Sequence, residues 1–204
     1  MSRIRLNRRS HVTGFQPLAT GSTEFGSALG RDFVTLTSFL DPTASITAQP
    51  VTLCFREGQK LKRYTPDFLV RSRIIPSELV EVRYEADLLL HRDRLQPGFS
   101  AARIWAFNEG LSFRAVTDRE IRTPLLENAK RLAPLRTAPM DALAAEELVG
   151  MARLRPNSTF GSLVSRFTGD RSAALATLWR LMARSQLRTD LTQSITYESA
   201  IWAP

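Results

Sequence analysis

The sequence predicts an α/β domain with a mixed sheet flanked by helices, followed by a small winged-helix-like domain. Three observations lead to this prediction. Short apolar runs typical of strands recur over residues 44–86. Helical patterns flank these runs at 23–39 and 99–109. After a proline-containing seam at 133–139, three further helical patterns precede an alternating segment. We therefore expect a basic arm (1–22), an α/β domain (23–136) and a C-terminal domain (140–204).

Residues 1–22 are expected to form an extended basic arm, because they show no apolar period. The arm carries Arg3, Arg5, Arg8 and Arg9 among small and turn-forming residues. It is either a solvated tail or a segment that lies along a phosphate backbone. No apolar stretch follows the first charges, so we do not expect a secretory signal.

The first helix is predicted at 23–39, where large apolar residues recur at steps of three and four, with Thr23 as its N-cap. Gly26 and Gly30 lie four residues apart and therefore on one face of this helix. Each glycine costs about 1 kcal/mol of helix propensity relative to alanine. Such a pair either permits close packing or marks positions where larger side chains were lost.

The next stretch is rich in strands. Runs at 46–52 and 53–55 lead into the turn Glu57–Gly58, and 61–70 returns as the second half of a hairpin. Cys54 lies in an apolar run, so we expect a buried structural thiol. As the single cysteine, it excludes an internal disulfide and a cysteine-built zinc site.

Tyr64–Tyr84 is the most informative stretch. Asp67 and Glu81 each interrupt a short apolar run, and alternation places Glu81 and Arg83 on one strand face. Buried charges require a partner or a metal. Restriction-type nucleases use the order Pro-Asp, spacer, acid-x-base to hold a divalent ion and activate water. The same residues also fit a turn followed by a surface ion pair.

The remaining elements complete both domains. A strand at 111–116 and helices beginning near Thr117 and Leu125 finish the α/β domain. Helices at 141–153, 160–166 and 171–185 follow, and 187–202 alternates as a β-ribbon would. Three helices and a ribbon suggest a winged helix, in which Arg171, Arg180 and Arg184 could face phosphates. Contact with DNA and contact with a protein both remain open for this domain.

The composition favours a nucleic-acid partner and a cytosolic location. The formal net charge is +8, and the only lysines are Lys60, Lys62 and Lys130. No apolar run approaches the roughly eighteen residues of a membrane span, so we expect no membrane contact. His11 and His91 lie in unrelated polar contexts, which argues against histidine-based catalysis.

Taken together, the chain resembles the TnsA-like endonuclease subunit of heteromeric transposases from about Ser10 to its C-terminus. The order and spacing of several short pieces carry the resemblance: RRSHVTG, GSALGRDF, FLDP, Gln49-Pro50, YTPDFLV, ELVEVR, FRAVTDREIRTPLLENAKRL and DLTQSITYESAIW. It implies a restriction-endonuclease-like fold in a bacterial cytosolic protein that cuts the 5′ ends of a transposon in double-stranded DNA. It further implies two partners, an integrase-type transposase and an AAA+ ATPase regulator.

The resemblance also implies a site in which acids hold Mg²⁺ or Mn²⁺ and a lysine positions the attacking water. Asp67 matches the aspartate of Pro-Asp, and Glu81 matches the acceptor on the next strand. Gly30 stands where the family has a metal-holding glutamate, Gly26 replaces a second glutamate, and Arg83 stands in place of the lysine.

These departures imply an impaired site. Mg²⁺ relies on carboxylates in near-ideal geometry, and arginine can neither shed a proton nor match the compact charge of lysine. We expect Arg83 to pair with Asp67 or Glu81 and to fill the position of the metal. Glu24 and Asp32 should point away from the helix face of Gly30. Candidates for a relocated lysine and for DNA contact are Lys60 and Lys62, on a strand expected near Asp67.

Three hypotheses follow. The leading one is a TnsA-like subunit that binds transposon-end DNA and partner proteins through a fold whose cutting site is degenerate. The second is an active Mg²⁺- or Mn²⁺-dependent endonuclease that uses Asp67, Glu81 and a displaced lysine. The third is a DNA-binding module repurposed outside transposition, which would need no metal.

Overall fold

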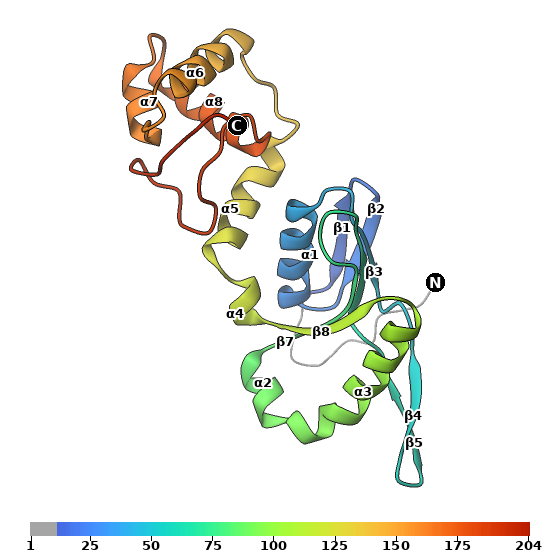
Figure 1. The fold of residues 1–204 in the computed structure, drawn as a ribbon. Helices are drawn as coiled ribbons and strands as arrows, with labels where there is room; N and C mark the ends of the chain where they lie inside the picture. Colours follow the sequence, from blue (N-terminus) through green and yellow to red (C-terminus); the bar gives the residue numbers. More distant parts are fainter. Residues whose placement is uncertain (1–11) are drawn as a thin grey trace. The chain divides into compact units, whose positions relative to one another are not determined.

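The computed structural model describes residues 12–204, and the chain forms two compact units (Figure 1). Unit 1 ends at Arg122 and unit 2 spans Thr123–Pro204, so the division precedes the seam expected at 133–139. Arg3, Arg5, Arg8 and Arg9 of the predicted arm lie outside the described residues. Within 12–204, no helix is both long and apolar enough to cross a membrane.

Unit 1 is built on a four-stranded mixed sheet, which confirms the predicted α/β class. The sheet has the order β3-β6-β7-β8. The pairs β3–β6 and β6–β7 are antiparallel, whereas β7 and β8 run parallel. The strands are β3 (Ser45–Ala48), β6 (Phe68–Arg71), β7 (Glu78–Arg83) and β8 (Ser112–Thr117).

Helices cover both faces of this sheet, because its strands alternate apolar side chains between the two faces. On one face, Phe68 stacks on Phe33 of α1 with ring centroids 5.3 Å apart. On the other face, Leu79 packs against Ala102 and Ala106 of α3. Figure 1 shows the helices in these positions. The helices of unit 1 are α1 (Ala28–Leu40), α2 (Glu85–Leu90), α3 (Arg92–Asn108) and α4 (Asp118–Ile121).

Two hairpins accompany the sheet. The first joins β1 (Gly14–Leu18), in the predicted arm, to β2 (Gly21–Phe25), which takes the place of the first residues of the helix predicted at 23–39. The second joins β4 (Leu53–Glu57) to β5 (Lys60–Tyr64) through the predicted turn. Gly58 adopts φ 58° at this turn, a left-handed conformation that suits glycine.

Two predictions near these hairpins are wrong. Thr23 does not cap a helix, because it pairs with Gln16 within the β1–β2 hairpin. The helix begins after Ser27, whose Oγ accepts a hydrogen bond from the Gly30 N–H. Cys54 is exposed, because Leu53 faces α3 and the next side chain of the strand points to the opposite side.

Unit 2 contains the three helices predicted after the seam, each within a few residues of its expected bounds. Its elements are α5 (Pro124–Leu132), the 3₁₀ turn η1 (Ala133–Leu135), α6 (Ala142–Leu154), α7 (Phe160–Arg166) and α8 (Arg171–Ala183). A core of leucines joins them, including the fully buried Leu148 and Leu178.

The ribbon predicted at 187–202 does not form. This segment contains no strand and takes part only in isolated bridges, between Thr159 and Ala200 and between Arg188 and Trp202. Its carbonyl groups are used elsewhere, since Tyr197 and Ser199 accept hydrogen bonds from the first turn of α7. The prediction of a ribbon is therefore wrong, and the winged-helix arrangement is not confirmed.

Candidate functional site

A cleft of about 540 Å³ in unit 1 brings the four predicted site residues together. Gly30, Asp67, Glu81 and Arg83 all line it. They come from the first turn of α1, the residue before β6, and the last half of β7. Gly30, Asp67 and Glu81 are far apart in the sequence, and the pairing of β6 with β7 sets the position of Asp67 relative to Glu81.

Asp67 lies where the chain enters β6. Its Oδ2 accepts a hydrogen bond from the Val82 N–H at 2.8 Å, and its carbonyl accepts one from the Gln49 N–H at 2.8 Å. Gln49 itself adopts φ 46°, which is uncommon for a residue with a side chain. Burial, together with the negative charge of Glu81, raises the pKa of Asp67 to about 8.

Glu81 is only 2% exposed, and both of its carboxylate oxygens accept hydrogen bonds. Arg83 Nε donates to Oε1 at 2.5 Å and Tyr64 Oη donates to Oε2 at 2.7 Å. The expected ion pair of Arg83 with an acid of the site is thus present. Burial raises the pKa of Glu81, although Arg83 and Tyr64 oppose this shift.

Tyr64 is a site residue that the sequence did not reveal. It is the last residue of β5, and its ring lies against α3 at Gly98, where an added Cβ would be 3.0 Å from the ring Cγ. Burial and the charge of Glu81 raise the pKa of the Tyr64 hydroxyl, so it stays protonated and donates. Nothing in the local pattern indicates a partner seventeen residues further along the chain.

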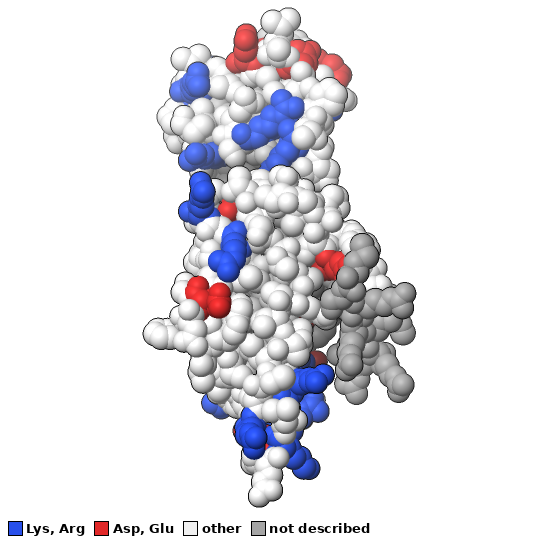
Figure 2. All heavy atoms as spheres, turned by 90° about the vertical axis from the view of Figure 1, so that its right-hand side faces the viewer, with Lys and Arg blue, Asp and Glu red and all other residues white. Residues whose placement is uncertain are grey.

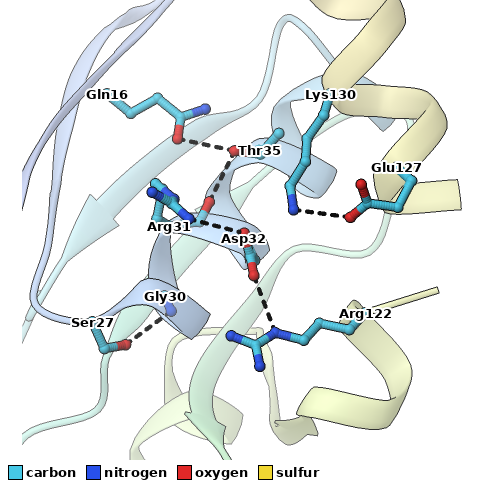
Figure 3. Close-up of polar contacts among 9 residues, drawn as sticks. All are labelled: Gln16, Ser27, Gly30, Arg31, Asp32, Thr35, Arg122, Glu127 and Lys130. Atoms are coloured by element: carbon cyan, nitrogen blue, oxygen red, sulfur yellow. Dashed lines mark hydrogen bonds and ion pairs between the residues drawn. The ribbon is translucent and has the colours of Figure 1, made fainter. Parts of the chain in front are cut away.

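The start of α1 contributes Leu29 and Gly30 to the lining of the cleft. Figure 3 shows the first turn of this helix, where the Gly30 N–H donates to Ser27 Oγ. A Cβ built on Gly30 would lie 3.2 Å from Ser27 Oγ and 3.4 Å from Phe68 Cζ, so a side chain fits after a shift of a few tenths of an ångström. Asp32 is not among the residues of the cleft, which agrees with the prediction that it points away from the helix face of Gly30. Its Oδ2 accepts a hydrogen bond from Arg122 Nε at 3.2 Å.

Glu24 does line the cleft, which contradicts the prediction that it points away from Gly30. The prediction failed because it placed Glu24 in the helix, whereas this residue lies in β2 opposite Phe15. Gly26 also lines the cleft, but it precedes α1 and does not share a helix face with Gly30.

Lys60 and Lys62 do not line the cleft. Their strand, β5, pairs with β4 and not with a strand of the main sheet. Lys62 forms an ion pair with Glu57 in the same hairpin. Neither residue therefore supplies the relocated lysine that we considered.

The α2–α3 segment adds Asp87, His91 and Arg94 to the cleft. Their spacing of four and three residues is the spacing of one helical face, a signal that the sequence analysis did not use. His91 lies between the two helices. His91 therefore lines the cleft, although its sequence context argued against histidine-based catalysis.

The hydrogen bonds of the cleft leave Glu81 without a free oxygen for a divalent metal ion. Position 30 contributes no side-chain oxygen, and both oxygens of Glu81 already accept hydrogen bonds. Arg83 places a positive charge beside Glu81. Over the described residues, no group of three or more His, Cys, Asp or Glu side chains is arranged to hold a metal.

The arginines predicted to face DNA in unit 2 differ in their surroundings. Arg184 donates from Nε to the Arg136 carbonyl at 3.1 Å and from Nη2 to the Ala138 carbonyl, so its side chain holds the segment after η1. Arg180 is partly buried. Arg171 is exposed at the first position of α8.

Part of the chain matches a known protein family. Residues 41–118 match the model of the TnsA-like endonuclease N-terminal domain. The matched stretch carries Asp67, Glu81 and Arg83 and begins after α1, so it does not include Gly30. No curated protein matches the chain.

Proposed function

We propose that this chain is a TnsA-like subunit of a DNA transposition machinery in which the nuclease site is impaired. It would bind transposon-end DNA beside an integrase-type transposase and an AAA+ ATPase regulator, in the bacterial cytosol. The TnsA-like endonuclease match at 41–118 supports the family, and the net charge of +8 supports a DNA partner.

The main support for an impaired site is that Glu81 accepts hydrogen bonds from both Arg83 and Tyr64. A carboxylate that ligates Mg²⁺ must offer an oxygen to the ion, and the ion must shed water to reach it. At Glu81 a guanidinium and a hydroxyl already satisfy these oxygens. Without a carboxylate at position 30, Asp67 would be left as the principal carboxyl group facing the ion, and burial favours its neutral form. One such group is too little for an ordered ion.

Metal binding by the isolated protein tests this proposal. Calorimetry with Mn²⁺ is expected to show no saturable binding to the native chain at millimolar metal. The double substitution Gly30→Glu with Arg83→Lys should restore binding, and adding Asp67→Ala should abolish it again. Saturable binding to the native chain that disappears with Asp67→Ala alone would overturn the impaired site.

Glu24 favours a second candidate, an active Mg²⁺- or Mn²⁺-dependent endonuclease. This carboxylate lines the same cleft as Asp67 and Glu81, so a rearranged side chain could supply the missing anionic group from β2. Transposon excision in the presence of the partner transposase separates the two candidates. Loss of excision with both Asp67→Ala and Glu24→Gln supports the endonuclease, and normal excision in both variants excludes it.

A further inference from the structure

We propose that the β4–β5 hairpin enters the major groove of bound DNA, with Arg56 and Arg63 on its contacting face. This inference rests on the proposed DNA binding and names the element that carries it. Lys60 and Lys62 were the residues of this hairpin expected to touch DNA. The structure instead favours DNA contact by the face of the hairpin that does not carry Lys62.

The register of the hairpin defines its two faces. Cross-strand partners share a face, and side chains alternate along each strand. The pairs Leu53–Tyr64, Phe55–Lys62 and Glu57–Lys60 therefore lie on one face, and Cys54–Arg63 and Arg56–Leu61 lie on the other. Burial agrees with this division, because Leu53 is 9% exposed against α3 whereas all four residues of the second face are exposed.

The second face, which we call the open face, concentrates positive charge without a balancing acid. Arg56 and Arg63 are diagonal neighbours across the two strands, a spacing of about 7–8 Å. In residues 12–204, neither arginine forms an ion pair with a carboxylate. On the opposite face, Glu57 neutralises Lys62. Two like charges held this close are stabilised by an anion that bridges or flanks them.

The shape of the element indicates the kind of anion. A two-stranded ribbon fits the major groove of B-DNA, which is about 12 Å wide and 8.5 Å deep. Five residues per strand extend about 17 Å, and Figure 1 shows the hairpin projecting from the rest of unit 1. Leu61 is 68% exposed on the open face, where it could touch a thymine methyl group. Figure 2 shows Lys and Arg side chains gathered over this hairpin.

The base of the ribbon is fixed to the cleft. Tyr64 ends β5 and donates to Glu81 inside the cleft, while Leu53 of the paired strand packs on α3. A single DNA duplex could therefore place a phosphate at the cleft and its major groove at the β4–β5 hairpin. The reach of about 17 Å corresponds to about five base pairs at 3.4 Å each. We therefore expect the hairpin to contact DNA about five base pairs away from the phosphate nearest Asp67.

Fluorescence anisotropy with the full chain and a labelled DNA duplex of generic sequence tests the inference. The variant Arg56→Gln/Arg63→Gln is compared with the matched control Arg71→Gln/Arg73→Gln, which removes the same charge from β6 and the loop that follows it. The logarithm of the binding constant falls linearly with the logarithm of the salt concentration, and loss of two phosphate contacts should make this slope shallower by about 1.8. Binding at 0.15 M salt should weaken about 30-fold. The control should bind like the native protein, and all three proteins should melt at the same temperature.

Groove-specific competitors complete the test. Methyl green, a major-groove ligand, should displace the native protein much more than the Arg56→Gln/Arg63→Gln variant, and netropsin, a minor-groove ligand, should not discriminate between them. Equal losses in the ribbon variant and the control, or selective competition by netropsin, would overturn the ribbon inference and leave the proposed function standing. A native chain that does not bind duplex DNA would overturn both.

Discussion

Arg83 Nε lies 2.5 Å from Glu81 Oε1, and the two side chains share one face of β7. Ion pairs two residues apart on a strand are ordinarily exposed and contribute below about 1 kcal/mol. This pair differs because the Glu81 side chain is 2% exposed, although that of Arg83 is 31% exposed. A buried carboxylate depends on its donors, and here the donors are Arg83 and Tyr64.

Replacing Arg83 by methionine should destabilise unit 1 by about 2–3 kcal/mol. Breaking a fully buried pair costs about 3–5 kcal/mol, and the partial exposure of Arg83 reduces this figure. Urea unfolding of the full chain measures the change. The double variant Glu81→Gln/Arg83→Met removes both charges and should recover most of the loss. A single variant as stable as the native protein would show that Glu81 does not need this partner.

Tyr64→Phe should lower the free energy of unfolding by about 1–3 kcal/mol. The substitution keeps the ring that packs against Gly98 and removes only the donor to Glu81 Oε2, so a buried acceptor loses its partner. Tyr197→Phe in unit 2 is a matched control, because this residue is 56% exposed and its hydroxyl forms no hydrogen bond within residues 12–204. Equal stability of the two variants would contradict a stabilising role for the Tyr64 hydroxyl.

Stability should fall as the pH rises through the neutral range. The pKa of Asp67 in the folded chain is raised to about 8, above its ordinary value of 3.8, so folding favours the protonated carboxyl. The contribution is complete below pH 3.8 and is lost progressively as the pH approaches and passes about 8. The pKa of Glu81 is raised as well and acts in the same direction.

Urea unfolding between about pH 5 and 9 measures this dependence. Asp67→Asn should flatten the curve and make the variant relatively more stable at the alkaline end. Glu109→Gln, an exposed acid at the end of α3, should leave the slope unchanged. A native protein whose stability rises over this range would be inconsistent with a protonated Asp67.

The site residues that the sequence could predict are those on or next to the adjacent strands β6 and β7. Asp67, Glu81 and Arg83 were expected together because the period of a strand places alternate side chains on one face, and β6 pairs with β7 as the hairpin-like order implies. Tyr64 and Glu24 were not found. Their positions depend on how two separate hairpins lie beside the sheet, and local periodicity carries no information on such contacts.

The same distinction explains unit 2. Its helices follow from the 3.6-residue period, and α7 begins and ends at the predicted residues. The segment 187–202 alternates polar and apolar residues like a strand, but this alternation does not show which other strand it would pair with. Its carbonyl groups instead meet the first turn of α7 and the side chain of Asn128.

Asn128 should therefore be the residue that holds this segment in place. It is 1% exposed on α5, and its Nδ2 donates to the carbonyls of Leu191 and Gln193 at 2.9 and 2.7 Å. Asn128→Ala leaves both acceptors unpaired and should cost about 2–3 kcal/mol, with faster amide exchange over residues 187–202. Gln186→Ala, an exposed residue just before the segment, is the control. Unchanged exchange in the Asn128 variant would mean that the contacts with α7 suffice to hold the segment, and the role assigned to Asn128 would be wrong.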